Sequence, residues 1–293
     1  AMVYRFDFHR NIAFSIVIFA AAESCHAFYH LIAFYGKHYY VPFTIENECF
    51  IICPTLTIRS KGIMRKNEKE LIAKAYEFAK QQHQGEKSGH DFEHIKRVFA
   101  NAKTLLKKEP QADKFIVEMS ALLHDIDDRK LNPGGNKAEM FLRELGLDEK
   151  AVNTIIETIA SIDFATTGSH PRLKTIEMKL LFDSDKLDAI GAIGICRAVL
   201  FGSWVQRPLF EADCFPKKDL TAEEYKDLSR KENNSINHFF DKLLKLKNAM
   251  QTETGRTEAQ KRHKTMVKFL YEFFREQGLR EWIAYLTAFE QEN

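Results

Sequence analysis

The sequence predicts an all-α protein, and three observations support this fold class. Residues 64–293 are rich in helix formers and carry apolar residues at helical spacing, beginning with MRKNEKELIAKAYEFA at Met64. Proline and glycine residues interrupt the pattern at intervals that suit separate helices. No alternating run long enough for a sheet appears, and no internal repeat stands out. We therefore expect one helical domain over residues 64–293.

The expected helices lie between the breaker residues. In order, we expect helices over 65–83, 92–108, 112–125, 136–145, 149–161, 173–201, 221–250 and 255–277, with a short amphipathic segment beyond 279. Asp91 is placed to cap the second of these helices, and Thr221 with Glu224 forms a capping box at the start of the seventh.

The first 63 residues differ from the rest of the chain. They hold three of the five cysteines and mix aromatic residues with few charges, without a sustained helical or strand period. We interpret residues 1–63 as a leader before a native start at Met64. The alternative is a secretory signal, because Arg5 and Arg10 precede an apolar stretch over 12–22 that ends in small residues. That stretch is too short to span a bilayer.

The charge balance and the cysteines narrow the class of protein. Lysine plus arginine (43) nearly balance aspartate plus glutamate (41), so no basic field favours nucleic acid or an acidic membrane. The five cysteines form no CxxC pair and leave one unpaired, which fits reduced thiols. We therefore expect a cytoplasmic protein with no nucleic-acid or membrane partner.

Four candidate metal ligands lie in predicted helices: His94, the adjacent pair His124-Asp125, and Asp185. The pair ends the apolar run MSALLHDI, and a buried imidazole beside a buried carboxylate costs several kcal/mol unless both are satisfied. One divalent cation would satisfy both groups. The alternative is a hydrogen-bonded His–Asp pair at the end of a helix.

Three aspartates fall within six residues of the apolar segment KLLFDSDKLDAIGAIGI. Burying all three is costly, so a function or specific partners must compensate. At helical spacing Asp185 and Asp188 share a face, whereas Asp183 points elsewhere. We predict Asp185 as a ligand and Asp188 as the residue that supports the ligands.

The order of His94, His124-Asp125 and Asp185 resembles the H…HD…D pattern of the HD superfamily of metal-dependent phosphohydrolases. The flanking segments HDFEHIKRV, ALLHDIDDRK, DSDKLDAIGAIGICRA and SINHFFDKLLKLKNAMQTETGRTEAQKRH are similar to small bacterial-type members, some of which act on nucleoside triphosphates. The resemblance covers about residues 64–274. It implies a single HD-domain helical bundle with extra C-terminal helices, in which these four residues bind the metal.

The resemblance also implies a mononuclear site. Relatives with two metal ions carry additional histidines between the HD pair and the last aspartate, where this chain has only His170. Two imidazoles and two carboxylates suit Mn²⁺, which we expect, as well as Co²⁺, Ni²⁺, Fe²⁺ and Zn²⁺. One departure concerns Ser161 to Asp163, where many relatives have His-Ser.

Charged residues near these motifs are candidates for catalysis and substrate binding. The resemblance draws attention to Asp128, which could orient water or a leaving group, and to Lys130, which could neutralise a phosphate. Their alternative is a polar helix end and loop. Arg97 lies one turn after His94 and is expected to stabilise developing charge. The candidate substrate-binding residues are Lys186, Arg197, His238 and Lys242.

The predicted reaction is hydrolysis of a phosphoester or phosphoanhydride. The expected substrate is a small phosphorylated molecule, most plainly a nucleotide, which would make the protein a nucleoside triphosphate pyrophosphohydrolase or a phosphatase. One alternative is a non-catalytic regulatory HD module that binds metal and nucleotide. Another is an HD-type oxygenase, which requires two iron ions.

Overall fold

The computed structural model describes part of the chain and divides it into two units. It describes residues 2–8, 12–18, 28–34, 37–43, 61–86, 91–127, 134–162, 173–218, 220–221, 224, 227, 229–230 and 232–292. The two units are Ala1–Arg65 and Lys66–Asn293. The predictions that concern Asp128, Lys130, His170 and Asp163 lie outside the described residues.

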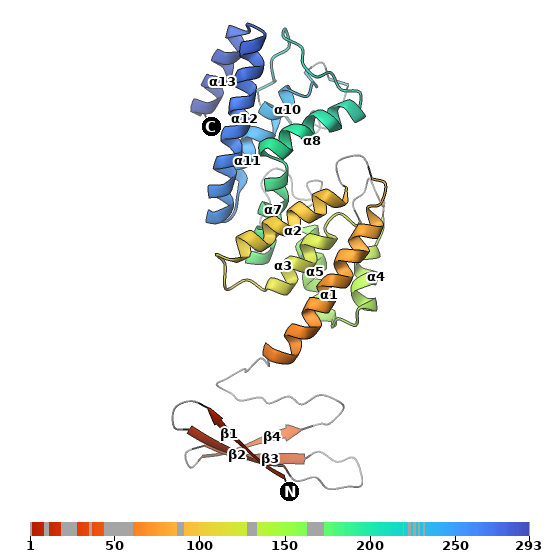
Figure 1. The fold of residues 1–293 in the computed structure, drawn as a ribbon, viewed down its shortest axis with the longest axis vertical. Helices are drawn as coiled ribbons and strands as arrows, with labels where there is room; N and C mark the ends of the chain where they lie inside the picture. Colours follow the sequence, from red (N-terminus) through yellow and green to blue (C-terminus); the bar gives the residue numbers. More distant parts are fainter. Residues whose placement is uncertain are drawn as a thin grey trace. The chain divides into compact units, whose positions relative to one another are not determined.

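The first unit contains two antiparallel strand pairs (Figure 1). Strand β1 (Met2–Phe8) pairs with β2 (Ile12–Ile18), and β3 (Phe28–Phe34) pairs with β4 (Lys37–Phe43). No strand is predicted here, because residues 1–63 show no sustained strand period, and β2 and β3 in particular are mostly apolar and do not alternate with polar residues. Their aromatic and β-branched residues are those that strands favour.

The described residues of the second unit form helices and connecting segments, which confirms the predicted all-α fold. The helices are α1 (Lys61–Gln82, which begins in the first unit), α2 (Phe92–Leu106), α3 (Lys114–Leu123), α4 (Lys137–Glu144), α5 (Glu149–Ala160), α7 (Ile176–Asp188), α8 (Gly191–Trp204), α10 (Asn237–Asp241), the 3-10 helix η1 (Leu243–Lys245), α11 (Leu246–Ala249), α12 (Glu253–Glu276) and α13 (Arg280–Glu292).

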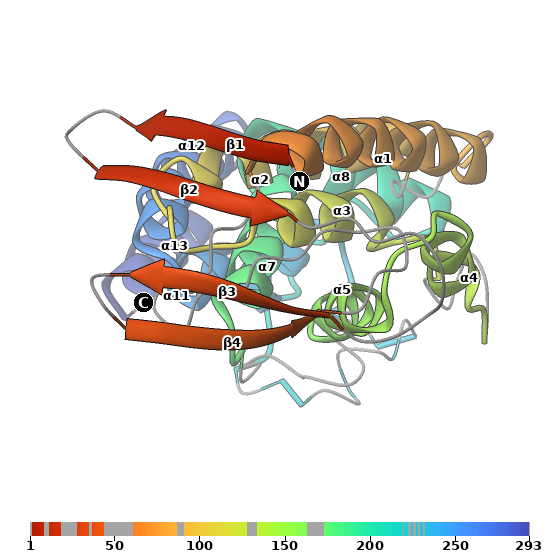
Figure 2. The same ribbon diagram turned by 90° about the horizontal axis from the view of Figure 1, so that it is seen from below.

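Two apolar cores hold the helices of this unit together. In the first core, α3 lies between α1 and α5 (Figure 2), and the buried residues include Ala75, Leu122 and Ile155. The second core joins α7 and α8 to the C-terminal helices, where Phe274 of α12 and Trp282 of α13 stack with ring centroids 5.1 Å apart. Helix α7 lies between the two groups of helices in Figure 1. It can therefore carry residues to a site at their junction.

The helix expected over 173–201 is instead two helices, α7 and α8, which meet at a bend of 68°. Gly191 has a φ of +77°, a left-handed conformation that favours glycine and changes the direction of the chain. Gly191 also packs closely against α12, since a Cβ at this position would lie 2.9 Å from the Cβ of Arg262. Among the described helices, none is by itself long and apolar enough to cross a membrane, although α7 and α8 taken together meet that test.

The prediction of one helix over residues 221–250 was wrong. The capping box forms, with Thr221 and Glu224 exchanging bonds of 3.0 and 3.2 Å, but the described residues from 227 to 236 are not helical. The side chain of Asn234 accepts a hydrogen bond of 2.8 Å from the N–H of Asn237, where α10 starts. Asn and Ser side chains that bond the nearby backbone compete with helix formation, and this segment reads Asn-Asn-Ser.

Candidate metal centre

Helix α2 places His94 in its first turn. The side chain of Asp91 accepts a hydrogen bond of 2.9 Å from the N–H of His94, so the predicted cap is confirmed. The imidazole is 1% exposed, because α2 packs on α3 and α7 at this point. It donates from Nδ1 to Asp188 of α7 at 2.7 Å. This bond fixes the ring and directs its other nitrogen, Nε2, away from Asp188.

The pair His124-Asp125 directly follows α3. Residues Ala121, Leu122 and Leu123 are fully buried and bring both side chains into the interior. His124 bonds the carbonyl oxygen of Ala121 through Nδ1 at 3.0 Å. A carbonyl only accepts, so Nδ1 carries the proton and Nε2 is the nitrogen that remains to bind a cation.

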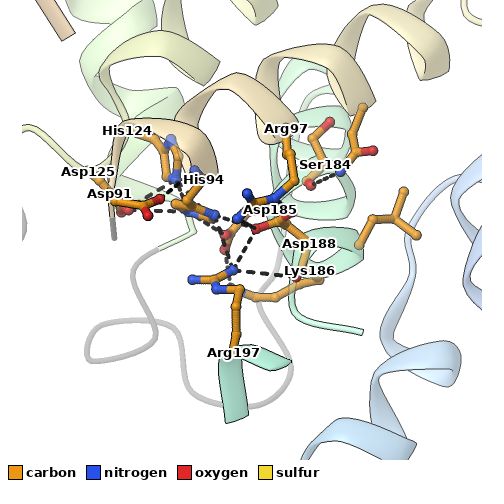
Figure 3. A network of polar contacts seen from close by, with 12 residues as sticks. Asp91, His94, Arg97, His124, Asp125, Ser184, Asp185, Lys186, Asp188 and Arg197 are labelled. Carbon is orange, nitrogen blue, oxygen red and sulfur yellow. Dashed lines mark hydrogen bonds and ion pairs between the residues drawn. The ribbon is translucent and has the colours of Figure 1, made fainter. Parts of the chain in front are cut away.

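Four side chains from three parts of the fold converge on one point (Figure 3). The Nε2 atoms of His94 and His124 are 3.3 Å apart, and oxygens of Asp125 lie 3.3 and 3.4 Å from them. Asp185 of α7 brings Oδ1 to 3.6 Å from His94 Nε2 and 4.0 Å from His124 Nε2. We refer to these four residues as the His–Asp cluster.

The spacing of these atoms fits a single cation. Donor atoms that each lie about 2.1 Å from one ion are separated by about 3.0 to 3.4 Å. Most distances in the His–Asp cluster fall near this range, and they are long for direct hydrogen bonds between partners. Nitrogen and carboxylate donors together suit the divalent transition metals. The cluster could therefore hold one divalent metal ion, as its three most buried members, His94, His124 and Asp125, indicate.

Asp188 supports the His–Asp cluster by bonding His94 on Nδ1, the nitrogen that does not face the other members of the cluster. It is 1% exposed and accepts from His94 Nδ1 at 2.7 Å, from Arg97 Nε at 2.6 Å and Nη2 at 3.1 Å, and from Arg197 Nη1 at 2.7 Å. A buried carboxylate needs partners of this kind to remain ionised. Asp188 therefore fixes one imidazole and two guanidinium groups at once.

The pKa shifts of the two imidazoles in the cluster have opposite directions. Burial lowers the pKa of His94, but hydrogen bonds with Asp125 and Asp188 outweigh it and raise the value to about 9. Burial lowers the pKa of His124, although Asp125 opposes this effect. For Asp188, burial raises the pKa, but bonds from His94 and Arg97 outweigh it and bring the value to about 2. The carboxylates of Asp125 and Asp188 thus favour positive charge at His94, whereas burial keeps His124 neutral.

Asp183, the third aspartate of the segment, points away from the cluster as predicted. It is fully buried, and its oxygens accept from the N–H of Gln251 at 2.8 Å and from the N–H and Oγ1 of Thr252 at 2.8 and 2.6 Å. These donors stand at the start of α12. Asp183 therefore joins α7 to α12.

Comparison with known proteins places the chain in a family. No protein-family model matches it. It is 36% identical over 190 residues to YpgQ of Bacillus subtilis, an alignment that covers 63% of this chain and 83% of YpgQ. The crystal structure of an HD-superfamily hydrolase from Bacillus thuringiensis is 34% identical with a TM-score of 0.57, and the match covers 72% of this chain and 98% of that one.

This chain belongs to the HD superfamily. A crystal structure of Bacillus subtilis YpgQ in complex with ADP also matches, with 28% identity, a TM-score of 0.58 and coverage of 72% of this chain and 96% of that one. The HD-superfamily hydrolase fold was therefore predicted correctly from the motif order. In this HD domain the motif residues come from α2, the end of α3, and α7.

The structure places the predicted charged residues in two regions. Lys186 donates to Asp185 Oδ2 at 2.7 Å, while Arg97 and Arg197 hold Asp188, so these three cations border the His–Asp cluster (Figure 3). His238 and Lys242 instead belong to the region of α10. The predicted catalytic residues Asp128 and Lys130 lie beyond the part of the chain that the structure describes.

The region of α10 holds two cations that sequence reasoning missed. Burial lowers the pKa of His238 well below its usual value, and the charges of Lys242, Arg207 and Arg230 lower it further. Arg230 also forms an ion pair of 2.5 Å with the buried Asp241. Arg207 and Arg230 lie in irregular segments far from any motif, and no sequence signal connected them with α10.

Proposed function

We propose that this chain is a metal-dependent phosphohydrolase that acts on a phosphoester or phosphoanhydride of a nucleotide. The observation that carries the proposal is the close grouping of His94, His124 and Asp125, with Asp185 Oδ1 3.6 and 4.0 Å from the two imidazole Nε2 atoms. In this proposal those four residues hold one divalent ion, for which Mn²⁺ is our first choice. The cationic border of the cluster supports a phosphate-bearing substrate.

When bound, the ion would supply an acidified water and a charge that polarises the phosphoryl group. The chain's own residues then have separate tasks. Lys186 is 14% exposed beside Asp185, where its ammonium can bind a phosphoryl oxygen and stabilise charge that develops on it. Arg197 of α8 is 21% exposed and paired with Asp188, so its positive charge borders the cluster and favours a phosphoryl group there. Arg97 is assigned to the same electrostatic role, and Asp188 orients both guanidinium groups.

Two predicted catalytic roles also belong to this proposal. Asp128 would orient water or the leaving group, and Lys130 would neutralise a phosphate, because both closely follow the His124-Asp125 pair in the sequence. His238 and Lys242 are proposed to bind a more distant part of the substrate. The choice of a nucleotide is supported by YpgQ, which was crystallised with ADP.

The test is a turnover assay on the full chain. Metal-stripped protein is supplied with Mn²⁺, Co²⁺, Ni²⁺ or Mg²⁺ and tested for release of pyrophosphate and phosphate from nucleotides and simple phosphoesters. We expect pyrophosphate from nucleoside triphosphates. Phosphate from monoesters would indicate a phosphatase instead. The double variant His124→Ala with Asp125→Ala should lose metal and turnover together, whereas Glu157→Gln, an exposed change on α5, should keep both.

Three outcomes would overturn the proposal. Full turnover in the double variant would remove the His–Asp cluster from the mechanism. One tightly bound ion with no turnover on any substrate would favour a regulatory module that binds metal. Two bound iron ions would favour the oxygenase alternative.

A further inference from the structure

A cavity of about 410 Å³ lies beside the His–Asp cluster, between α2 and the C-terminal helices. The residues that matter for its chemistry are Arg97 and Asn101 of α2, Asp188 of α7, Gly191 of α8, and Lys261 and Arg262 of α12. In Figure 3, Arg97 lies on the other side of the polar network from His124 and Asp125. The cavity is thus separated from the cluster by the contact between Arg97 and Asp188.

The charges on the cavity wall favour an anion. Three cationic side chains line it, and the one carboxylate among the lining residues is Asp188, whose oxygens are held by Arg97, Arg197 and His94. Lys261 is 70% exposed, and its contact of 3.3 Å with Glu258 is a surface pair that contributes little. Its ammonium can therefore turn toward a ligand at small cost.

Hydrogen bonds within the protein already hold the other polar side chains of the cavity wall in place. Arg262 donates to the carbonyl of Leu187 at 2.6 Å and to Asn101 Oδ1 at 3.0 Å, and Asn101 donates to the carbonyl of Ser184 at 3.0 Å. Gly191 allows this close approach of α8 to α12. A wall fixed in this way costs little ordering when a ligand binds.

The cavity also has an apolar part. Ala100 of α2 and Ile190, Ala192 and Ile193 around the start of α8 line it beside the cations. Its volume lies within the range of small-molecule sites. A ligand with a phosphate group and a less polar body, such as a nucleoside monophosphate, matches both parts of the wall.

We propose that this cavity is a second anion site, which binds a phosphate-bearing small molecule separately from the His–Asp cluster. The site is linked to the cluster because Arg97 is shared. An anion in the cavity competes with Asp188 for the Arg97 guanidinium, and a less neutralised Asp188 is a stronger acceptor for His94 Nδ1. This makes the imidazole a better metal ligand. Occupation of the cavity therefore tightens metal binding.

Binding to metal-free full-length protein tests the first part of the proposal. Titration calorimetry with AMP should show binding, and adenosine, which lacks the phosphate, should bind at least about tenfold more weakly. Lys261→Glu should weaken AMP binding by about tenfold or more. Lys264→Glu is the matched control, because Lys264 is exposed on the same helix and does not line the cavity. Absence of AMP binding, or equal affinities in Lys261→Glu and wild type, would overturn the proposal.

Metal linkage tests the second part. AMP should raise the Mn²⁺ affinity of the wild-type chain by about fivefold, and this rise should disappear in Lys261→Glu. An equal rise in that variant would show that AMP acts at the metal itself and would overturn the link. Neither readout requires turnover, so failure of the second site and failure of the proposed hydrolase activity are distinguishable.

Discussion

Replacing Asp188 with asparagine should weaken metal binding although Asp188 is not a proposed ligand. Its Oδ2 accepts from His94, Arg97 and Arg197, and its Oδ1 accepts from Arg97 Nε at 2.6 Å. An amide has one acceptor oxygen, so the best orientation of the new side chain keeps the three contacts at the Oδ2 position and turns its NH₂ group toward Arg97 Nε. That arrangement loses one charge-assisted bond and the negative charge beside His94.

The expected loss follows from this change. Removing a carboxylate that supports a metal-binding histidine typically weakens metal binding about 10- to 100-fold. Arg97 and Arg197 are 33% and 21% exposed, so water can replace part of the hydrogen bonding that their guanidinium groups lose. The unfolding free energy should therefore fall by only about 1–2 kcal/mol. Free Mn²⁺ measured by electron paramagnetic resonance gives the affinity, with a thermal melt to confirm folding. Glu157→Gln removes one exposed carboxylate and should bind as wild type does. A folded Asp188→Asn protein with affinity within about twofold of wild type would show that Asp188 does not support metal binding through His94.

Three further substitutions test other contacts. Gly255→Ala should lower the unfolding free energy by about 1–3 kcal/mol, because a Cβ there would lie 2.2 Å from Asp183 Oδ2; a rise in melting temperature would contradict this. Since burial and neighbouring cations lower the pKa of His238, the unfolded chain takes up a proton below about pH 6.5 that the folded chain does not, so stability falls there. The melting temperature of His238→Asn should therefore fall less than that of wild type as the pH is lowered, and parallel curves would refute the assignment. Glu290→Gln should speed amide hydrogen exchange in α13, because Glu290 of α13 accepts from His263 Nε2 of α12 at 2.6 Å. Unchanged exchange would show that this hydrogen bond does not stabilise α13.

The sequence was sufficient to predict the helices whose apolar spacing and whose capping or helix-breaking residues indicate the same boundaries. Helix α2 begins after Asp91 as expected, because its cap and its apolar stripe indicate the same start. The prediction of one helix over 221–250 was wrong. The apolar residues of this segment have helical spacing, but the side chain of Asn234 in its Asn-Asn-Ser stretch bonds the nearby backbone and competes with the helix. The break before Gly191 depends on contact with α12, and spacing within one segment does not reveal it.

Motif order was also sufficient to predict the four cluster residues together, because His94 and Asp185 lie on helices and His124-Asp125 directly follows one. Helical spacing likewise separated Asp183 from Asp185 and Asp188. The partners of Asp188 were only partly foreseeable: Arg97 is one turn from His94, but Arg197 reaches Asp188 only because the chain turns sharply before α8. Contacts of that kind depend on tertiary packing, which no local pattern encodes.

The three aspartates of α7 show how one helix can serve both fold and site. Asp183 accepts from Thr252, the residue that caps the start of α12, and Arg262 of α12 donates to the carbonyl of Leu187 at 2.6 Å. The cavity wall therefore depends on Asp183, although this residue touches neither the cavity nor the His–Asp cluster. Asp183→Asn should accordingly lower stability and weaken AMP binding, while metal affinity, which depends on Asp185 and Asp188, changes little. If Asp183→Asn instead lost metal in proportion to Asp188→Asn, the two faces of α7 would not be independent.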